Sequence, residues 1–227
     1  IAHYTTRDRN MLAIQSELIS AHALGIRNIL CLRGDAPRIG DYPNATAVWD
    51  VTSVGLITIL ANLNRGLDAN GSPIGECADF CIGAAFNPHA ENMRRERTLL
   101  QRKLEAGAHF VVTNPLFELT AMERCLEALA DIKLPVLVGV MPLISARQAN
   151  YLHHEVPGMT IPERIRRQIE SAGEDADKIG LELALELLAA GRGIVRGAYI
   201  VPGGERYDIA IKLIGAARGL LSPTLHS

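Results

Sequence analysis

The chain has 227 residues, of which 48% are hydrophobic and 21% are charged, and its formal net charge at pH 7 is −2. A charge balance this close to neutral argues against nucleic acids or anionic membranes as partners, because these select strongly basic proteins. No apolar run approaches the roughly 20 residues needed to cross a bilayer, so we expect a globular protein that does not span a membrane.

Six apolar runs with the length of buried strands follow one another along the chain, and each is succeeded by a segment of helical periodicity. The predicted strands are Ala2–Tyr4, Asn28–Leu32, Phe80–Phe86, His109–Thr113, Pro135–Met141 and Ile194–Val201. The predicted helices are Arg9–Leu24, Ser53–Leu63, Glu91–Ala106, Thr120–Ala130, Ser145–His153, Ile161–Ser171, Glu174–Ala190 and Glu205–Leu220. Repeated strand–helix units predict a parallel sheet with helices outside it.

Turn residues set the bounds of several elements. Asn114 and Pro115 should end the fourth strand, and Thr120 is a suitable N-cap for the helix that follows. The segment Asp68–Glu76 reads as a hairpin or a surface excursion, with the dipeptide Asn70-Gly71 as its turn signal. A polar segment from Arg33 to Thr46 is long enough to be a functional loop.

The fold class predicted from these units is α/β, as a TIM (β/α)₈ barrel. Eight units close such a barrel over about 250 residues, whereas the sequence shows six of the eight, starts inside a strand and has no initiator Met. The expectation is therefore a barrel truncated at its N-terminus, in which residues 1–227 form a single partial domain. Such a sheet would expose two edges that the missing units should cover.

The four cysteines, Cys31, Cys77, Cys81 and Cys125, do not resemble a metal site. Two of them lie in apolar strand or helix patterns, which favours buried thiols in a reducing compartment. Cys77 and Cys81 form a C-x₃-C pair without a second pair or a histidine at ligand spacing. We therefore predict no metal.

In a parallel α/β barrel the chemistry lies where the strands end. Arg33–Asp35 follows the second strand: its glycine permits close approach of a ligand and its Asp35 places a negative charge there, although a surface Arg–Asp pair explains the tripeptide equally well. His3 is either a structural histidine or a ligand contact. Arg102 and Lys103 either belong to a solvated helix face or reach a phosphate.

Five motifs, in order along the chain, resemble those of the methylenetetrahydrofolate reductases. They are His3-Tyr-Thr-Thr-Arg-Asp-Arg-Asn10, Leu32-Arg-Gly-Asp35 with Pro37, Ala84-Ala-Phe-Asn-Pro88, Gly107-Ala-His-Phe110 leading to Thr113-Asn-Pro115, and Gly139-Val-Met-Pro142. Two further segments, Leu152–Gly158 and Ala172–Asp175, look closest to the reductase half of bifunctional homocysteine S-methyltransferase/methylenetetrahydrofolate reductase proteins. A fused N-terminal methyltransferase module and a homo-oligomer are compatible with that resemblance.

The resemblance implies a cytoplasmic flavoprotein of one-carbon metabolism and methionine biosynthesis. Its reaction would be the FAD-dependent reduction of 5,10-methylenetetrahydrofolate to 5-methyltetrahydrofolate, with NADH or NADPH as hydride donor. By similarity, the residues that contact FAD are His3, Thr5, Arg33, Gly34, Asp35, Asp50, Arg102 and Lys103. Asp35 matches the catalytic acidic residue beside the flavin, and Asn114, Tyr199 and Arg206 match substrate-binding positions.

Two departures from the family pattern bear on activity. Asn114 stands where the family often has Gln, which is one methylene longer. The family's general acid is a Glu on the first barrel strand, which this sequence lacks, so the chain as given is expected to be inactive and poorly stable. Two alternatives stay open: a catalytically silent barrel subunit, and a flavin reductase of the same fold acting on another pterin or one-carbon carrier.

Overall fold

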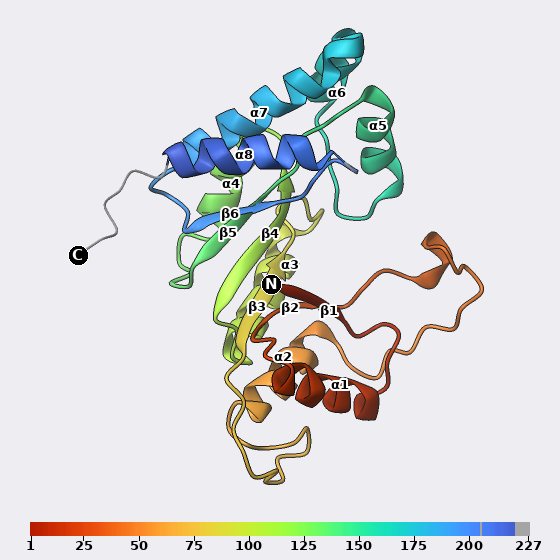
Figure 1. Ribbon diagram of the computed structural model, residues 1–227, viewed down its shortest axis with the longest axis vertical. Helices are drawn as coiled ribbons and strands as arrows, with labels where there is room; N and C mark the ends of the chain where they lie inside the picture. Colours follow the sequence, from red (N-terminus) through yellow and green to blue (C-terminus); the bar gives the residue numbers. More distant parts are fainter. Residues whose placement is uncertain (205, 221–227) are drawn as a thin grey trace. The chain divides into compact units, whose positions relative to one another are not determined.

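The computed structural model describes residues 1–204 and 206–220, and its strands form one six-stranded sheet in the order β1-β2-β3-β4-β5-β6. The strands are β1 (Ala2–Thr5), β2 (Asn28–Leu32), β3 (Cys81–Phe86), β4 (Phe110–Leu116), β5 (Val136–Val140) and β6 (Gly197–Ile200) (Figure 1). Strand order follows chain order and helices alternate with the strands, which is the arrangement of consecutive units in a (β/α)₈ barrel. The α/β fold predicted from the sequence is confirmed.

Helices follow every strand, and the longest connection, between β5 and β6, holds several of them. The helices are α1 (Met11–Ala23), α2 (Ser53–Leu63), α3 (Met93–Glu105), α4 (Leu119–Ala128), α5 (Ala146–Glu155), α6 (Glu163–Ser171), α7 (Ala176–Gly191) and α8 (Tyr207–Leu220), with short 3₁₀ turns at Pro37–Ile39 and Gly173–Asp175. The side chains of Asn10, Thr52 and Ser145 accept hydrogen bonds from backbone N–H groups in the first turns of α1, α2 and α5. These N-caps determine where the three helices begin. In the described part of the chain, no helix combines the length and the apolar character needed to cross a membrane.

The chain forms two compact units. The first comprises Ile1–Phe86 with Arg94–Val111, and the second comprises Asn87–Met93 with the chain from Val112 onward. The expectation of a single domain over residues 1–227 stays a prediction.

In the first unit, β1, β2 and β3 pair in parallel. Ala2 lies opposite Ile29 and Asn28 lies opposite Cys81, so the three strands are in step along the sheet. Helices α1 and α2 pack beside each other on these strands (Figure 1). The interior is made of fully buried aliphatic side chains, namely Ile14, Leu18, Ile29, Leu56, Ile57, Leu60 and Ile82.

In the second unit, β5 and β6 pair in parallel, with Leu137 opposite Gly197. One cluster of buried side chains joins the end of β4 to helices α5 to α7; it comprises Phe117, Leu143, Ala149, Leu152, Ile161, Ile165, Ile169 and Ala176. Helices α7 and α8 lie side by side (Figure 1). The predicted start of the last helix, Glu205, lies outside the described residues.

The structure corrects several predicted bounds, and those of β4, α4 and β6 have evident causes. Strand β4 continues through Pro115 to Leu116; the adjacent Gly139 makes room, because a Cβ there would lie 2.8 Å from the Pro115 nitrogen. Helix α4 begins at Leu119, so Thr120 lies inside the helix and is not its N-cap. The N-cap is Glu118, whose backbone is extended.

Strand β6 is shorter than predicted. Ile194 belongs to a turn, since its backbone N–H donates to the carbonyl oxygen of Gly191 at the end of α7. The hairpin predicted at Asn70-Gly71 is confirmed as a tight turn: Asp68 N–H donates to Ser72 O at 2.8 Å, and Leu67 bridges antiparallel to Pro73.

The cysteines divide by exposure. Cys31 on β2 and Cys125 on α4 are buried, Cys81 is partly buried and Cys77 is exposed, and all four are free thiols. Burial raises the pKa of Cys31 above its ordinary value and that of Cys125 to about 12. No three His, Cys, Asp or Glu side chains of the described residues gather as metal ligands.

Candidate active site

The carboxyl ends of β1 and β2 bring Thr5 next to the Arg33–Asp35 segment. Thr5 lies opposite Leu32 in the parallel ladder. Gly34 has φ +83°, and a Cβ at this position would lie 3.1 Å from the Cβ of Arg7 and 3.2 Å from that of Thr5. The positive φ favours glycine, and a Cβ here would push Arg7 and Thr5 aside by a few tenths of an ångström, so glycine lets the loop lie directly on the end of β1.

His3 and Thr5 share one face of β1, since side chains two residues apart on a strand point the same way. His3 is exposed, although partial burial of its ring lowers its pKa below the ordinary 6.5. The two side chains therefore lie one after the other along the strand, with Thr5 nearer to Gly34.

Asp35 is anchored through its backbone, and its side chain is exposed to solvent. Arg7 Nη1 donates to the carbonyl oxygen of Asp35 at 3.0 Å, while the guanidinium pairs with the carboxylate of Asp8 at 2.6 Å. The hydrogen bonds and ion pairs of the described residues give the Asp35 carboxylate no direct partner. An exposed, fixed negative charge thus follows β2.

The segment after Asp35 reaches away from the strands and then returns to them (Figure 1). On its return, Val48 N–H donates to Arg7 O at 2.7 Å. Trp49 lies under the guanidinium of Arg33, whose Cζ is 4.4 Å from the ring centroid, a cation–π contact. Asp50 accepts from the Met11 N–H at 3.3 Å, placing its charge at the positive end of α1.

Arg102 and Lys103 are neighbours on α3 with opposite environments. Arg102 is exposed, whereas Lys103 is only 5% exposed and donates from Nζ to Ala85 O at 2.6 Å. Burial lowers the pKa of Lys103, and the charge of Glu96 opposes that shift. None of the ion pairs among the described residues includes Lys103, so this buried ammonium has only a neutral carbonyl as direct partner.

In the second unit, Asn114 and Pro115 at the end of β4 are held by two other loops. Asn114 Nδ2 donates to Gly158 O at 3.1 Å, and His89 Nε2 is 2.8 Å from Pro115 O. Because a carbonyl oxygen only accepts, His89 must carry its proton on Nε2 here. Thr113 Oγ1 accepts from the Gly139 N–H at 2.9 Å, fixing the same strand end from β5.

Burial lowers the pKa of His89 below 6.5, although the bond to Pro115 O partly opposes this. Since the unfolded chain then binds a proton more readily than the folded one, stability is full above pH 6.5 and declines as the pH falls below it. We expect the free energy of unfolding to fall less between about pH 7.5 and about pH 5 in His89→Gln than in the unsubstituted protein, because glutamine keeps a donor and does not titrate. Urea titrations at each pH measure this free energy. Equal slopes would assign the acid sensitivity to other groups.

Tyr199 lies on β6, and Arg206 lies just before α8. The Arg206 guanidinium pairs with Asp208 at 2.8 Å and with Asp177 of α7 at 3.1 Å. The hydrogen bond from Arg206 lowers the pKa of Asp208 to about 2. Arg206 therefore ties α7 to α8 and would have to leave these carboxylates to reach a substrate.

The predicted residues fall into two groups. All the residues assigned to FAD by similarity lie in the first unit, and Asn114, Tyr199 and Arg206 all lie in the second. Within the first unit, Thr5 is a direct neighbour of the Arg33–Asp35 segment. Asp50 lies where the chain after Asp35 has returned to the strands. Lys103 is set apart from them by its burial under β3.

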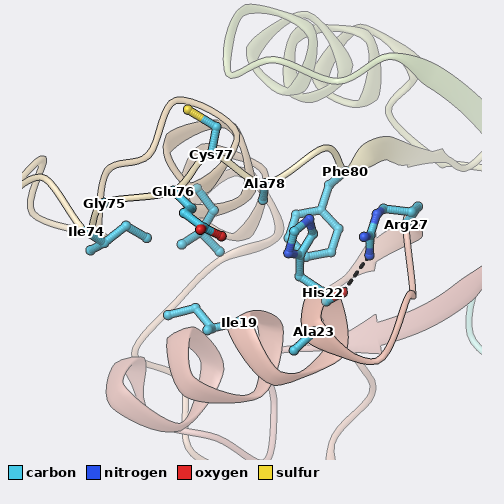
Figure 2. A pocket seen from close by; sticks show the side chains of 11 residues that line it. Ile19, His22, Ala23, Arg27, Ile74, Gly75, Glu76, Cys77, Ala78 and Phe80 are labelled. Atoms are coloured by element: carbon cyan, nitrogen blue, oxygen red, sulfur yellow. Dashed lines mark hydrogen bonds between the residues drawn. The ribbon is translucent and has the colours of Figure 1, made fainter.

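A pocket of about 590 Å³ lies in the first unit, at the opposite ends of the strands. Figure 2 shows Ile19, His22 and Ala23 on α1, facing the segment of residues 74–78, with Phe80 beside His22. The ring centroids of His22 and Phe80 are 5.5 Å apart. His22 bonds to Asp79 at 2.8 Å, and Arg27 pairs with the same carboxylate. None of the predicted site residues lines it. Of its charged lining groups, Arg27 pairs with Asp79, whereas the ion pairs of the described residues do not include Glu76.

Residues 1–194 match the family model described as methylenetetrahydrofolate reductase. The chain belongs to this family. The family prediction made from the five motifs is thereby confirmed.

Several curated relatives carry the same name. A probable methylenetetrahydrofolate reductase (NADPH) of Caenorhabditis elegans is 27% identical over 82% of this chain and 27% of its own length. Methylenetetrahydrofolate reductase 1 of Schizosaccharomyces pombe is 25% identical over 98% of this chain and 36% of its length. The 5,10-methylenetetrahydrofolate reductase of Escherichia coli is 25% identical over 72% of this chain and 51% of its length. The chain thus spans about half or less of these methylenetetrahydrofolate reductases.

Two contacts of this chain were not predicted. No role was predicted for Trp49, the single tryptophan, although its isolated position in a polar segment was the available signal for a stacking role. Gly158 was named only as the end of the segment Leu152–Gly158 that resembles the family; its contact with Asn114 joins segments 44 residues apart and leaves no local trace.

Proposed function

We propose that the complete protein reduces 5,10-methylenetetrahydrofolate to 5-methyltetrahydrofolate, using NADH or NADPH and bound FAD. The observation that carries the proposal is the family match across residues 1–194, which includes the ends of the first five strands. The names of the relatives support reduction of the same substrate.

The first unit fits a flavin dinucleotide in the chemistry of its donors. A diphosphate requires cations and N–H donors, and here Arg33 and Arg102 are exposed cations on two elements, while the buried Lys103 would have to leave Ala85 O to reach a phosphate. Gly34 exposes backbone beside Thr5, where no side chain intervenes. Bound FAD would accept the hydride from NAD(P)H and deliver it to the folate.

Asp35 is proposed to act by charge. Its carboxylate is exposed and unpaired among the described residues, and its backbone is fixed by Arg7, so the charge stays at the end of β2. A negative charge there stabilises a cationic form of the folate when its carbon accepts a hydride. His3, Thr5 and Asp50 are proposed as further contacts of the cofactor, and Asn114, Tyr199 and Arg206 as contacts of the substrate.

Lys103→Met should weaken FAD binding. Methionine keeps the length of the side chain and removes a charge that the fold buries without a carboxylate, so we expect a rise of about tenfold or more in the dissociation constant for FAD. The measurement is fluorescence quenching of FAD titrated with apoprotein. Arg94→Met, an exposed cation on the same helix, is the matched control and should leave the affinity unchanged. Unaltered affinity in Lys103→Met would remove Lys103 from the cofactor site.

The absorption spectrum of the full-length protein tests the proposal directly. A flavin spectrum should appear, bleach with NADPH or NADH under anaerobic conditions, and recover when methylenetetrahydrofolate is added. A protein that cannot be reconstituted with FAD would refute the proposal and favour a silent barrel subunit. Bleaching without recovery would point instead to a flavin reductase with another acceptor.

A further inference from the structure

The pocket of the first unit is lined by α1 and by the segment that leads into β3 (Figure 2). Its volume of about 590 Å³ lies within the roughly 300–1,000 Å³ of sites that enclose a small molecule. Ile19 and Ile74 in its lining are 43% and 40% exposed, so a ligand would remove apolar surface from water. The apolar side chains that line the pocket are Ile19, Ala23, Leu63, Ile74, Ala78 and Phe80.

Hydrogen bonds hold the segment that forms one wall of this pocket at both of its ends. Ile74 N–H donates to Gly66 O at 2.9 Å. At the other end, Asn64 Oδ1 accepts from Phe80 N–H at 2.7 Å, and Asn64 Nδ2 donates to Phe80 O at 2.9 Å. Residues 75–79 therefore lie between two fixed points, and the pocket is formed before any ligand arrives.

The two basic side chains of the lining, Arg27 and His22, already have acceptors. Arg27 Nη1 donates to His22 O at 2.6 Å and to Ile26 O at 3.2 Å, and the guanidinium also pairs with Asp79. His22 Nε2 lies 2.8 Å from the same Asp79 carboxylate. Neither side chain could hold an anionic ligand without giving up these contacts, so the pocket does not suit an anion.

Glu76 carries the charge that the pocket leaves for a ligand. The hydrogen bonds and ion pairs of the described residues give its exposed carboxylate no partner. In Figure 2 this carboxylate lies on the side of its segment that faces Ile19, whereas the sulfur of Cys77 lies on the far side. An acid beside apolar side chains is complementary to a cation that carries an apolar group.

We propose that this pocket binds a small organic cation, an amine attached to an aromatic or branched aliphatic body. The ammonium group pairs with Glu76, and the apolar body covers Ile19 and Ile74. An ion pair in open water contributes little, but a ligand body that covers the carboxylate excludes water and strengthens the pair. The site is independent of the proposed function, because its lining includes none of the candidate active-site residues.

The test titrates 2-phenylethylamine, a cation at neutral pH, into the full-length protein labelled at its isoleucine methyl groups. Methyl NMR follows Ile19 and Ile74 in the pocket, with the exposed Ile211 of α8 as the reference. Two analogues keep the phenyl body: 2-phenylethanol is neutral, and 3-phenylpropionate is an anion. Glu76→Gln removes the charge at nearly constant size, and Glu105→Gln, at an exposed position of the same unit, is the matched control. The methyl spectrum of each variant also shows that it is folded.

The amine should shift the methyl signals of Ile19 and Ile74 and not that of Ile211, with a dissociation constant of about 1 mM, as a ligand of this size allows. The alcohol should bind about tenfold more weakly than the amine. Glu76→Gln should weaken binding of the amine about tenfold, while Glu105→Gln should change it by less than about twofold.

Three results would overturn the proposal. The first is the absence of any shift at Ile19 and Ile74 up to a probe concentration about tenfold above the expected dissociation constant. The second is equal affinity for the amine in Glu76→Gln and in the unsubstituted protein, which would leave the carboxylate without a part in binding. The third is tighter binding of 3-phenylpropionate than of the amine, which would make the pocket a site for anions.

Discussion

Replacing Gly180 with alanine is expected to destabilise the second unit more than any other single methyl addition to this chain. Gly180 is buried in α7, and a Cβ there would lie 1.8 Å from the carbonyl oxygen of Leu143 and 2.7 Å from its carbonyl carbon. Backbone atoms cannot rotate aside as a side chain can, so the helix must move off the segment that follows β5. We expect a loss of about 3 kcal/mol or more in the free energy of unfolding, at the upper end of overpacking effects.

Gly215→Ala is the matched control for this prediction. Gly215 is also helical, in α8, but it is exposed and has nothing within 4 Å of a Cβ. Alanine there should stabilise the protein by about 0.5–1 kcal/mol through its higher helix propensity. The measurement is urea unfolding followed by circular dichroism. Similar midpoints for the two variants would mean that α7 does not pack on Leu143 as described.

The second large effect is expected for Asp35→Asn, in the rate of folate reduction. The substitution keeps the shape of the side chain, and the backbone contact from Arg7 to Asp35 O does not depend on the charge. If the carboxylate stabilises positive charge on the folate, its loss should lower kcat/KM for methylenetetrahydrofolate about 10²-fold, as removal of a preorganised electrostatic group does. Flavin content should not change.

Steady-state kinetics of the full-length protein, with flavin absorbance to count active sites, would measure this. Asp41→Asn removes an exposed acid from the same segment and serves as the control for general changes in charge. A decrease of less than about threefold in Asp35→Asn would exclude the proposed electrostatic role. An equal loss in Asp41→Asn would indicate a diffuse effect of net charge.

The sheet could be predicted from the sequence because its strands are short apolar runs with local signals at their ends. All six strands were expected within a few residues of where they lie, and the turn at Asn70-Gly71 was placed correctly. The errors arose where tertiary contacts override local preference. Pro115 should end a strand, but β4 continues through it because Gly139 on the adjacent strand makes room.

The candidate site was less accessible to sequence reasoning. The order of strand ends predicts that Thr5 and Gly34 lie together, and they do. Pattern alone did not distinguish Arg102 from Lys103, since both fall on a charged helix; burial separates them because only Lys103 faces β3. Likewise, nothing local to Arg206 indicates its pairs with Asp177 and Asp208.

The distribution of cysteines gives each compact unit its own internal probe of unfolding. Cys125 is the only cysteine in the sequence of the second unit, and Cys31 is a fully buried thiol of the first. Because burial raises the pKa of both, neither supplies the thiolate that alkylating reagents require until its surroundings open. The times at which the two thiols become alkylated thus report separately on the opening of each unit, without any introduced cysteine.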